Sequence, residues 1–168
     1  YSEKYKHLKP DFVACRYVLN VLSDQIGFIK ILRKNLENSP NTIVYFEVPN
    51  ALHTFEDKVI WNVAYEHRAW FTEDSLTYLF ESCGFEVINL TKCWNDEFLG
   101  IEALPKPLFA PVHFPKFQNI EKLNNIILSF SKDFQKLKGE SKKKIAEIKH
   151  QKIKTIAWGA GARAVTFF

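Results

Sequence analysis

The sequence contains no methionine, only three cysteines and no long uninterrupted apolar run. A helix that crosses a membrane needs about 20 consecutive apolar residues, so the absence of such a run argues against a membrane protein. No basic segment followed by an apolar stretch opens the chain, as a secretion signal would. The composition therefore predicts a cytoplasmic protein. Because the chain begins at Tyr1 without an initiator, we expect it to be an internal fragment of a longer protein.

The cysteines stand far apart, at Cys15, Cys83 and Cys93. Their odd number and the absence of a C-x-x-C pair argue against a disulfide framework and against a zinc knuckle. A metal site built from His53, Glu66 and His67 is a weaker alternative, because the chain has no H-E-x-x-H motif and no helical histidine pair. We therefore expect no metal ligands in this chain.

The residues that are present suit a folded globular domain, with 46% apolar and 15% aromatic content. The net charge of +4 comes largely from a lysine-rich stretch at 132–154. Such a stretch is usually the solvated face of a helix. Nucleic-acid binding is disfavoured, since no RNA-binding or zinc-finger motif accompanies the lysines.

The first half of the chain alternates strand and helix patterns. Residues 11–19 are mostly apolar, β-branched and aromatic, as in a strand buried on both faces. Ser23 and Asp24 can cap a helix with apolar residues at helical spacing, and a second strand at 42–50 ends at Pro49. This strand, helix, strand order predicts a parallel pair.

Further elements follow an irregular stretch at 51–70. Thr72 is placed to cap a helix that ends at Gly84. Two runs, 85–94 and 97–104, are expected to form antiparallel strands joined by a polar turn.

The second half begins with a connector that has four prolines in twelve residues, "LPKPLFAPVHFP", typical of a domain boundary. A long amphipathic helix, a second basic helix after Gly139 and a closing strand "KTIAW" are expected beyond it. The predicted organisation is an α/β domain over 1–104, a connector over 105–118 and linker helices with the start of a further domain over 119–168.

The stretch richest in chemistry is "WNVAYEHRAWF", residues 61–71, which places Tyr65, Glu66 and His67 side by side just beyond a strand. Ligands of open α/β sheets bind outside the carboxyl ends of the strands. A histidine there can act as a general base oriented by a neighbouring carboxylate, or it can be a packed structural residue.

Two polar residues flank Pro49 at the end of the second strand, Glu47 and Asn50. They are placed either to bind a substrate at the edge of the sheet where the strands end or to cap the loop that follows the strand. Near the end of the chain, Gly159, Gly161 and Ala164 have the spacing of a G-x-G-x-x-A turn, which lets backbone amides approach a phosphate. A plain strand-to-helix turn is an equal alternative.

Four motifs in order, "FEVPN", "YEHRAWFTEDSLTYLFESCGFEV", "EFLGIEA" and "WGAGARAVTF", resemble those of the S-adenosylmethionine (SAM)-dependent sugar C-methyltransferases. The resemblance covers nearly all of the chain. It implies the C-terminal half of a Rossmann-like class I methyltransferase sheet, then linker helices and the start of a second Rossmann-like α/β domain. It also implies that most of the SAM site, and any zinc, lie in a region upstream of this chain.

The resemblance also assigns roles to residues. His67 is implied to remove a proton from the carbon next to a ketone in a nucleotide-linked sugar, with Glu66 and Tyr65 beside it. Arg16 and Asn20 are implied to contact the cofactor. Glu47, Asn50, Gly159, Gly161 and Arg163 are implied to contact the substrate, Arg163 through a phosphate. The family's tyrosine falls on Ala64 here, which is a departure from the pattern.

Two functions follow. The first is SAM-dependent C-methylation next to a carbonyl of a small, nucleotide-sugar-like molecule. The alternative is a Rossmann-like module that binds a nucleotide or dinucleotide at the glycine turn without methyl transfer. The sequence does not indicate the oligomeric state.

Overall fold

The computed structural model describes residues 3–5, 7–63, 67–107, 120–156, 158–159 and 161. These residues form two compact units. One contains the described residues up to 51 together with 67–107. The other contains 52–63 together with the described residues from 120 onward.

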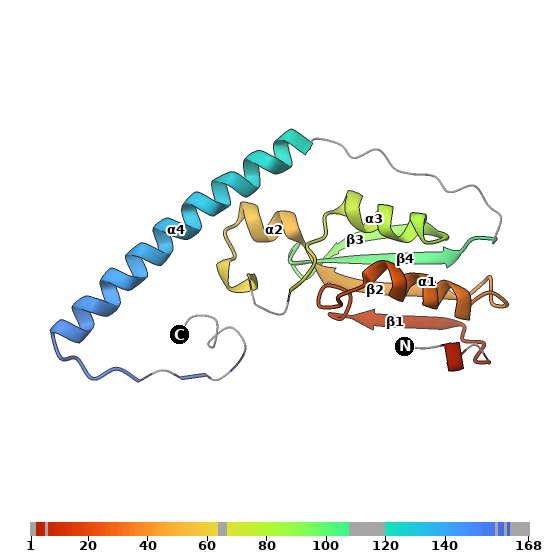
Figure 1. Cartoon of the computed structure of the whole chain (residues 1–168), viewed down its shortest axis with the longest axis horizontal. Helices are drawn as coiled ribbons and strands as arrows, with labels where there is room; N and C mark the ends of the chain where they lie inside the picture. The colour runs from red at the N-terminus through yellow and green to blue at the C-terminus, as the bar shows by residue number, and fades with distance from the viewer. Residues whose placement is uncertain are drawn as a thin grey trace. The chain divides into compact units, whose positions relative to one another are not determined.

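The first unit is built on a four-stranded sheet with the order β1-β2-β4-β3 (Figure 1). The strands are β1 (Phe12–Arg16), β2 (Ile43–Pro49), β3 (Phe85–Cys93) and β4 (Phe98–Pro105). β1 and β2 pair in parallel, whereas β4 is antiparallel to both β2 and β3. The mixed α/β class, the parallel pair and the antiparallel pair that the sequence predicts are confirmed.

Two helices follow from local capping signals. α1 (Gln25–Asn35) begins after Asp24, whose side chain accepts a hydrogen bond from the Gly27 amide at 2.8 Å. α3 (Glu73–Ser82) begins after Thr72, which forms a reciprocal capping box with Ser75. Both N-caps agree with the sequence prediction, because short polar side chains satisfy amides that the first helical turn leaves unbonded.

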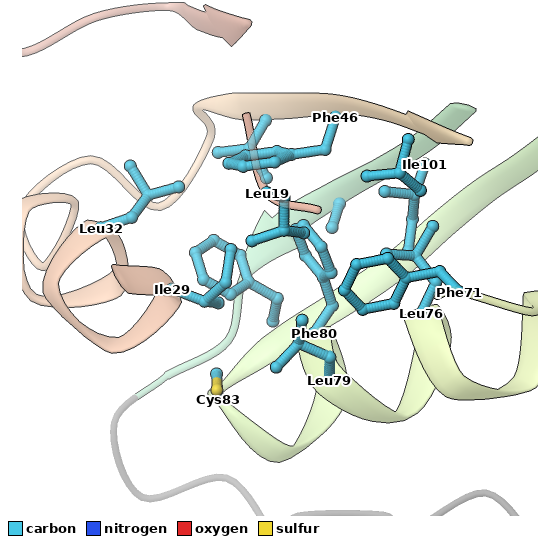
Figure 2. Packing of buried hydrophobic residues seen from close by; sticks show 14 of the residues in the cluster. Leu19, Ile29, Leu32, Phe46, Phe71, Leu76, Leu79, Phe80, Cys83 and Ile101 are labelled. Carbon is cyan, nitrogen blue, oxygen red and sulfur yellow. The ribbon is translucent and has the colours of Figure 1, made fainter. Parts of the chain in front are cut away.

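Both helices pack on one face of the sheet and enclose its core. α1 contributes Ile29 and Leu32, and α3 contributes Leu76 and Phe80 (Figure 2). The strands supply alternate residues, because successive side chains point to opposite faces of a sheet. These are Val44, Phe46 and Val48 of β2 and Leu99, Ile101 and Ala103 of β4.

β1 departs from the prediction of a strand buried on both faces. Phe12, Ala14 and Arg16 are exposed, and Val13 and Cys15 are only partly buried. The reason is that β1 lies at the edge of the described sheet and the helices cover one face only. The strand also ends earlier than expected, because Tyr17 has a φ of +58°, which no extended strand contains.

The stretch expected to be irregular contains short helices, so that expectation is wrong. α2 (Ala51–Glu56) follows β2 directly, and a 3₁₀ turn, η2 (Ile60–Asn62), follows α2. A further 3₁₀ turn, η1 (Glu3–Tyr5), precedes β1. Helices this short carry little periodicity, so their formation depends on tertiary contacts.

α4 (Ile120–His150) is one helix where the sequence predicts two. It continues through Gly139, which has no atom near the position a Cβ would occupy. A helical glycine costs about 1 kcal/mol, which one residue in so long a helix can lose without a break. No helix of the described residues is long and apolar enough to cross a membrane.

The expected strand "KTIAW" is not formed in the described residues 154–156 and 158. Trp158 and Ile156 are almost fully exposed there, and no strand of the described residues covers them. Residues 108–119, which include most of the connector, and the residues from 162 onward lie outside the described residues. The domain boundaries at 104 and 118 and the further Rossmann-like domain therefore stay predictions.

Candidate functional site

The candidate site lies at the edge of the sheet where β1 and β2 end. Because the two strands are parallel, their carboxyl ends meet at the same edge, with Arg16 directly opposite Glu47. This is the edge at which open α/β sheets bind ligands. The chain segments that follow the two strands begin at this edge. The segment after β1 leads to Asn20, and the segment after β2 begins with Asn50.

Arg16 and Glu47 form an ion pair across the two strands. The Arg16 guanidinium donates to Glu47 Oε1 from Nε at 3.2 Å and from Nη2 at 3.0 Å. The Glu47 side chain is only 4% exposed, whereas 48% of the Arg16 side chain remains exposed. The sequence assigned Arg16 to the cofactor and Glu47 to the substrate, and the structure joins them in one cluster.

Two tyrosine hydroxyls complete this cluster, which we call the Glu47 cluster (Arg16, Tyr17, Tyr45 and Glu47). Tyr45 donates its hydroxyl hydrogen to Glu47 Oε2 at 2.8 Å. The Tyr17 hydroxyl accepts a hydrogen bond from Arg16 Nη2 at 3.1 Å. Gly100 leaves room for the Tyr45 hydroxyl, because a Cβ at Gly100 would lie 3.0 Å from the hydroxyl oxygen.

The cluster holds Glu47 as a carboxylate. Burial alone raises the pKa of this group, but hydrogen bonds from Tyr17, Arg16 and Tyr45 outweigh burial and lower the pKa of Glu47 below its usual range. In turn, burial and then the hydrogen bond to Glu47 raise the pKa of Tyr45. The cluster therefore combines an exposed cation with a fixed, buried anion.

Asn20 connects the end of β1 to the loop that carries His67. Its backbone carbonyl accepts hydrogen bonds from the amides of Arg68 at 2.8 Å and Ala69 at 3.1 Å. The residue is only 2% exposed. Its side-chain oxygen Oδ1 is buried and has no hydrogen-bond partner in the described part of the chain. Such an acceptor is costly unless something else donates to it.

His67 lies in this loop and is partly buried. Its ring meets the Trp70 ring edge to face, with 5.3 Å between the ring centroids, and its Nδ1 atom is shielded from solvent. The two amides that follow His67 bond to Asn20, so the loop is held at the carboxyl end of β1. Tyr65 and Glu66 lie outside the described residues, so their predicted roles stay predictions.

Asn50 is buried and contacts the turn between β3 and β4. Its side-chain amide donates to the Asp96 carbonyl at 2.9 Å, and its backbone amide donates to the Glu97 carbonyl at 2.9 Å. It thus ties the end of β2 to the turn between β3 and β4. This arrangement matches the loop-capping alternative that the sequence left open.

The glycine turn belongs to the second unit, whereas Glu47, Asn50 and His67 belong to the first. Gly159 has a φ of +127°, which favours glycine, and no atom lies near the Cβ position of either Gly159 or Gly161. Arg163 lies outside the described residues. No strand precedes the turn in the described residues 154–156 and 158.

Sequence reasoning missed Tyr17 and Tyr45. A signal for Tyr45 exists, since it lies two residues before Glu47 and so on the same face of β2. Tyr17 has no such signal, because its position depends on a left-handed residue and on the Phe98 ring, 4.9 Å away between centroids.

The described residues contain no group of three or more side chains that could hold a metal ion. His53, the alternative ligand, instead pairs with Asp57 one helical turn further on, at 2.8 Å.

Comparison with known proteins identifies one family. A family model described as a methyltransferase domain matches residues 1–90, which is more than half of the chain. The matched region contains β1, α1, β2 and α3 and hence the Glu47 cluster, Asn20 and His67. A comparison with curated proteins gives no match.

Proposed function

Because the chain belongs to the methyltransferase-domain family, we propose that it takes part in SAM-dependent C-methylation next to a carbonyl, with His67 as the general base. Family membership accounts for methyl transfer from SAM. The acceptor, a nucleotide-linked sugar or a similar small molecule, is supported by the four motifs that resemble sugar C-methyltransferases. The observation that carries the role of His67 is its loop, bonded through two amides to Asn20 at the carboxyl end of β1.

The residues at this edge fit SAM. The buried Asn20 Oδ1 offers an acceptor to the amino or hydroxyl groups of the cofactor. The exposed part of Arg16 offers a cation to a carboxylate, with its orientation fixed by Glu47. When bound, SAM supplies an electrophilic methyl group.

The chemistry asked of the protein is proton removal. A hydrogen on the carbon next to a carbonyl is acidic enough for a positioned imidazole to remove near neutral pH. The proton passes to His67, and the electron pair of the broken C–H bond delocalises onto the carbonyl oxygen. Because Nδ1 of His67 is shielded, Nε2 is the atom we assign to this step. The resulting carbanion is the nucleophile that methylation requires.

The test replaces His67 with glutamine in the full-length protein. We expect methyl transfer from labelled SAM to fall by roughly 10²–10⁴-fold, the usual contribution of a general base. Exchange of the substrate's α-hydrogen with deuterated solvent, followed by NMR, should fall in parallel. SAM affinity, measured by calorimetry, should stay within about twofold, since a base contributes little to cofactor binding.

The matched control is His150→Gln at the exposed end of α4, which should leave all three measurements unchanged. Full methyl transfer by the His67→Gln protein would contradict the base assignment. Absence of SAM binding by the wild-type protein would contradict the function as a whole. The nucleotide-binding alternative is not favoured by any contact of Gly159 or Gly161 in the described residues.

A further inference from the structure

The turn between β3 and β4 lies at the carboxyl edge of the sheet, beside the candidate site. β4 is antiparallel to β2, and its first residue, Phe98, pairs with Pro49, the last residue of β2. The turn, residues 94–97, therefore lies at the edge where β1 and β2 end (Figure 1). It belongs to the same compact unit as the Glu47 cluster and His67.

Three consecutive residues of this turn have a left-handed backbone. The φ angle is +53° at Trp94, +58° at Asn95 and +67° at Asp96. Asparagine and aspartate adopt this conformation several times more often than other non-glycine residues, but a bulky side chain rarely does. Trp94 is therefore the residue whose side chain disfavours its own backbone conformation. Such conformations persist where the surrounding structure enforces them, and they concentrate at sites that bind ligands.

Asn50 provides contacts that enforce the shape of the turn. Its side-chain amide donates to the Asp96 carbonyl at 2.9 Å, and its backbone amide donates to the Glu97 carbonyl at 2.9 Å. Within the turn, the Glu97 amide donates to the Trp94 carbonyl at 3.3 Å. Because Asn50 is only 2% exposed, its bonds to the turn are shielded from water.

Asn50 also connects the turn to the segment that carries His67. Its backbone forms a parallel bridge with Phe71, and the amide of the next residue, Ala51, donates to the Phe71 carbonyl at 2.9 Å. Phe71 lies four residues after His67, whose ring contacts that of Trp70. The turn and the proposed general base are thus linked through described contacts of the first unit.

The side chain of Trp94 is open to solvent. It is 67% exposed, although an indole ring is one of the largest apolar surfaces that a side chain can bury. An exposed aromatic ring beside a binding edge is suited to stack on a planar ring of a ligand, since every nucleobase has a π-face. The strained backbone and the exposed indole ring at this edge therefore both point to a ligand contact.

The order of the strands indicates which ligand would meet this ring. Arg16 and Asn20, which we assign to SAM, lie at the end of β1, and the order β1-β2-β4-β3 places β2 between β1 and the turn. Neighbouring strands lie about 4.8 Å apart, so the start of β4 is about 10 Å from the end of β1. The turn is therefore better placed for the methyl acceptor than for the cofactor.

We propose that Trp94 is a substrate-binding residue that stacks on the base of a nucleotide-linked acceptor. The identity of the acceptor rests on the proposed function, which the role of Trp94 makes more specific. The turn supplies affinity for the base, whereas proton removal stays with His67.

The experiment measures ligand binding to the full-length protein by calorimetry. The probes are uridine diphosphate and guanosine diphosphate, which carry a base, and inorganic pyrophosphate, which does not. Trp94→Gly should weaken the binding of both nucleotides roughly 5- to 100-fold, the loss expected when a base-stacking ring is removed. Its affinity for pyrophosphate should stay within about twofold of wild type. Trp94→Phe keeps a ring and should bind both nucleotides within about threefold of wild type.

Two controls separate stacking from damage to the fold. Glycine adopts a left-handed backbone without strain, so the urea midpoint of the Trp94→Gly protein should not fall below that of wild type. Phe12→Ala removes a ring that is 56% exposed at the start of β1, the end of that strand away from the site. This change should leave every affinity unchanged.

A further probe, S-adenosylhomocysteine, distinguishes the two possible sources of a stacked base. The Trp94→Gly protein should bind it within about twofold of wild type, because the adenine of the cofactor is not the ring that Trp94 meets. A loss confined to S-adenosylhomocysteine would overturn the proposal.

The remaining outcomes also decide. Equal nucleotide affinities of the wild type and the Trp94→Gly protein, or no binding of either nucleotide by the wild type, would overturn the role of Trp94. An equal loss for pyrophosphate would overturn it too, because the base would then contribute nothing. If the loss is confined to the nucleotides while the His67→Gln protein is fully active, the base assignment of His67 fails and the role of Trp94 is supported.

Discussion

Glu47 is a carboxylate that the fold keeps ionised while shielding it from water. Its hydrogen bonds come from Tyr17, from Arg16 on the neighbouring strand and from Tyr45 two residues earlier on the same strand. These donors lower the pKa of Glu47 against the opposing effect of burial. The carboxylate in turn holds the Arg16 guanidinium, whose other half stays exposed. A single residue thereby sets the electrostatic character of the strand ends.

Replacing Glu47 with glutamine tests this at the residue scale. We expect a loss of about 1 kcal/mol in the free energy of unfolding at pH 7, since half of the ion pair is screened by water. Because the pKa of Glu47 is lower in the folded protein than in the unfolded protein, its ionisation stabilises the fold at pH values above the unfolded-state pKa of about 4.3. This stabilisation is lost as the pH falls through the folded-state pKa. The difference from wild type should therefore shrink below about pH 4.

Urea unfolding at several pH values measures this difference. Glu86→Gln on β3, where the side chain is exposed, should change the free energy of unfolding by less than about 0.5 kcal/mol at every pH. A deficit of the Glu47→Gln protein that stays constant down to pH 3 would show that the ionised form contributes nothing.

At the scale of elements, the link between α3 and β3 depends on one glycine and one arginine. Gly84 has a φ of +87° and follows the end of α3. Its carbonyl accepts hydrogen bonds from Arg33 Nε at 3.0 Å and from the Lys106 amide at 2.9 Å, and Arg33 also donates to the Lys106 carbonyl. Burial lowers the pKa of Arg33. α1, α3 and the end of β4 are thus joined at one turn.

Two glycine-to-alanine changes should have opposite effects. Gly84→Ala should lower the free energy of unfolding by about 1–2 kcal/mol, because an L-residue is strained at positive φ. Gly139→Ala in α4 should raise local helix stability by up to about 1 kcal/mol, since nothing lies near its Cβ position. Thermal unfolding, monitored by circular dichroism, compares the stability of the two variants. Equal changes in stability would contradict the assigned backbone conformations of Gly84 and Gly139.

At the scale of the whole molecule, the first unit depends on a core that lies on one face of its sheet. Phe80 of α3 is fully buried, and its ring contacts Phe46 at 5.1 Å and Phe85 at 5.7 Å between centroids. A helix residue thus contacts side chains of both β2 and β3, and Figure 2 shows Phe46 and Phe80 in the same core. The core therefore holds the strand ends, and with them the candidate site, in place.

Phe80→Ala should lower the free energy of unfolding by about 3–5 kcal/mol, because it leaves a cavity that the surrounding rings cannot fill. Domains of this size are stable by only about 5–15 kcal/mol, so SAM binding should weaken through partial unfolding. Ile88→Ala, at a side chain that is 45% exposed, should cost less than about 1 kcal/mol. Equilibrium denaturation measures the free energy of unfolding of both variants. Similar losses for Phe80→Ala and Ile88→Ala would contradict a core that lies on one face of the sheet.

The sequence by itself determined the elements whose signals are local. Asp24 and Thr72 cap helices because a short polar side chain next to an apolar period suffices for that role. Gly84 ends α3 because only glycine adopts positive φ without strain. The alternation of β2 and β4 likewise follows from their own residues, and so does the α/β class.

Tertiary structure alone decided which side chains meet. Arg16 faces Glu47 because of strand register, which a sequence does not state, and Tyr17 joins them through a left-handed backbone that no local pattern indicates. The exposure of β1 and the formation of α2 depend on what packs against them. Within the second unit, Phe55 packs against Phe130 and Lys58 pairs with Asp133, although these partners lie more than 60 positions apart in the chain. Pairings over such separations arise from the free energy of packing, which no single stretch of sequence contains.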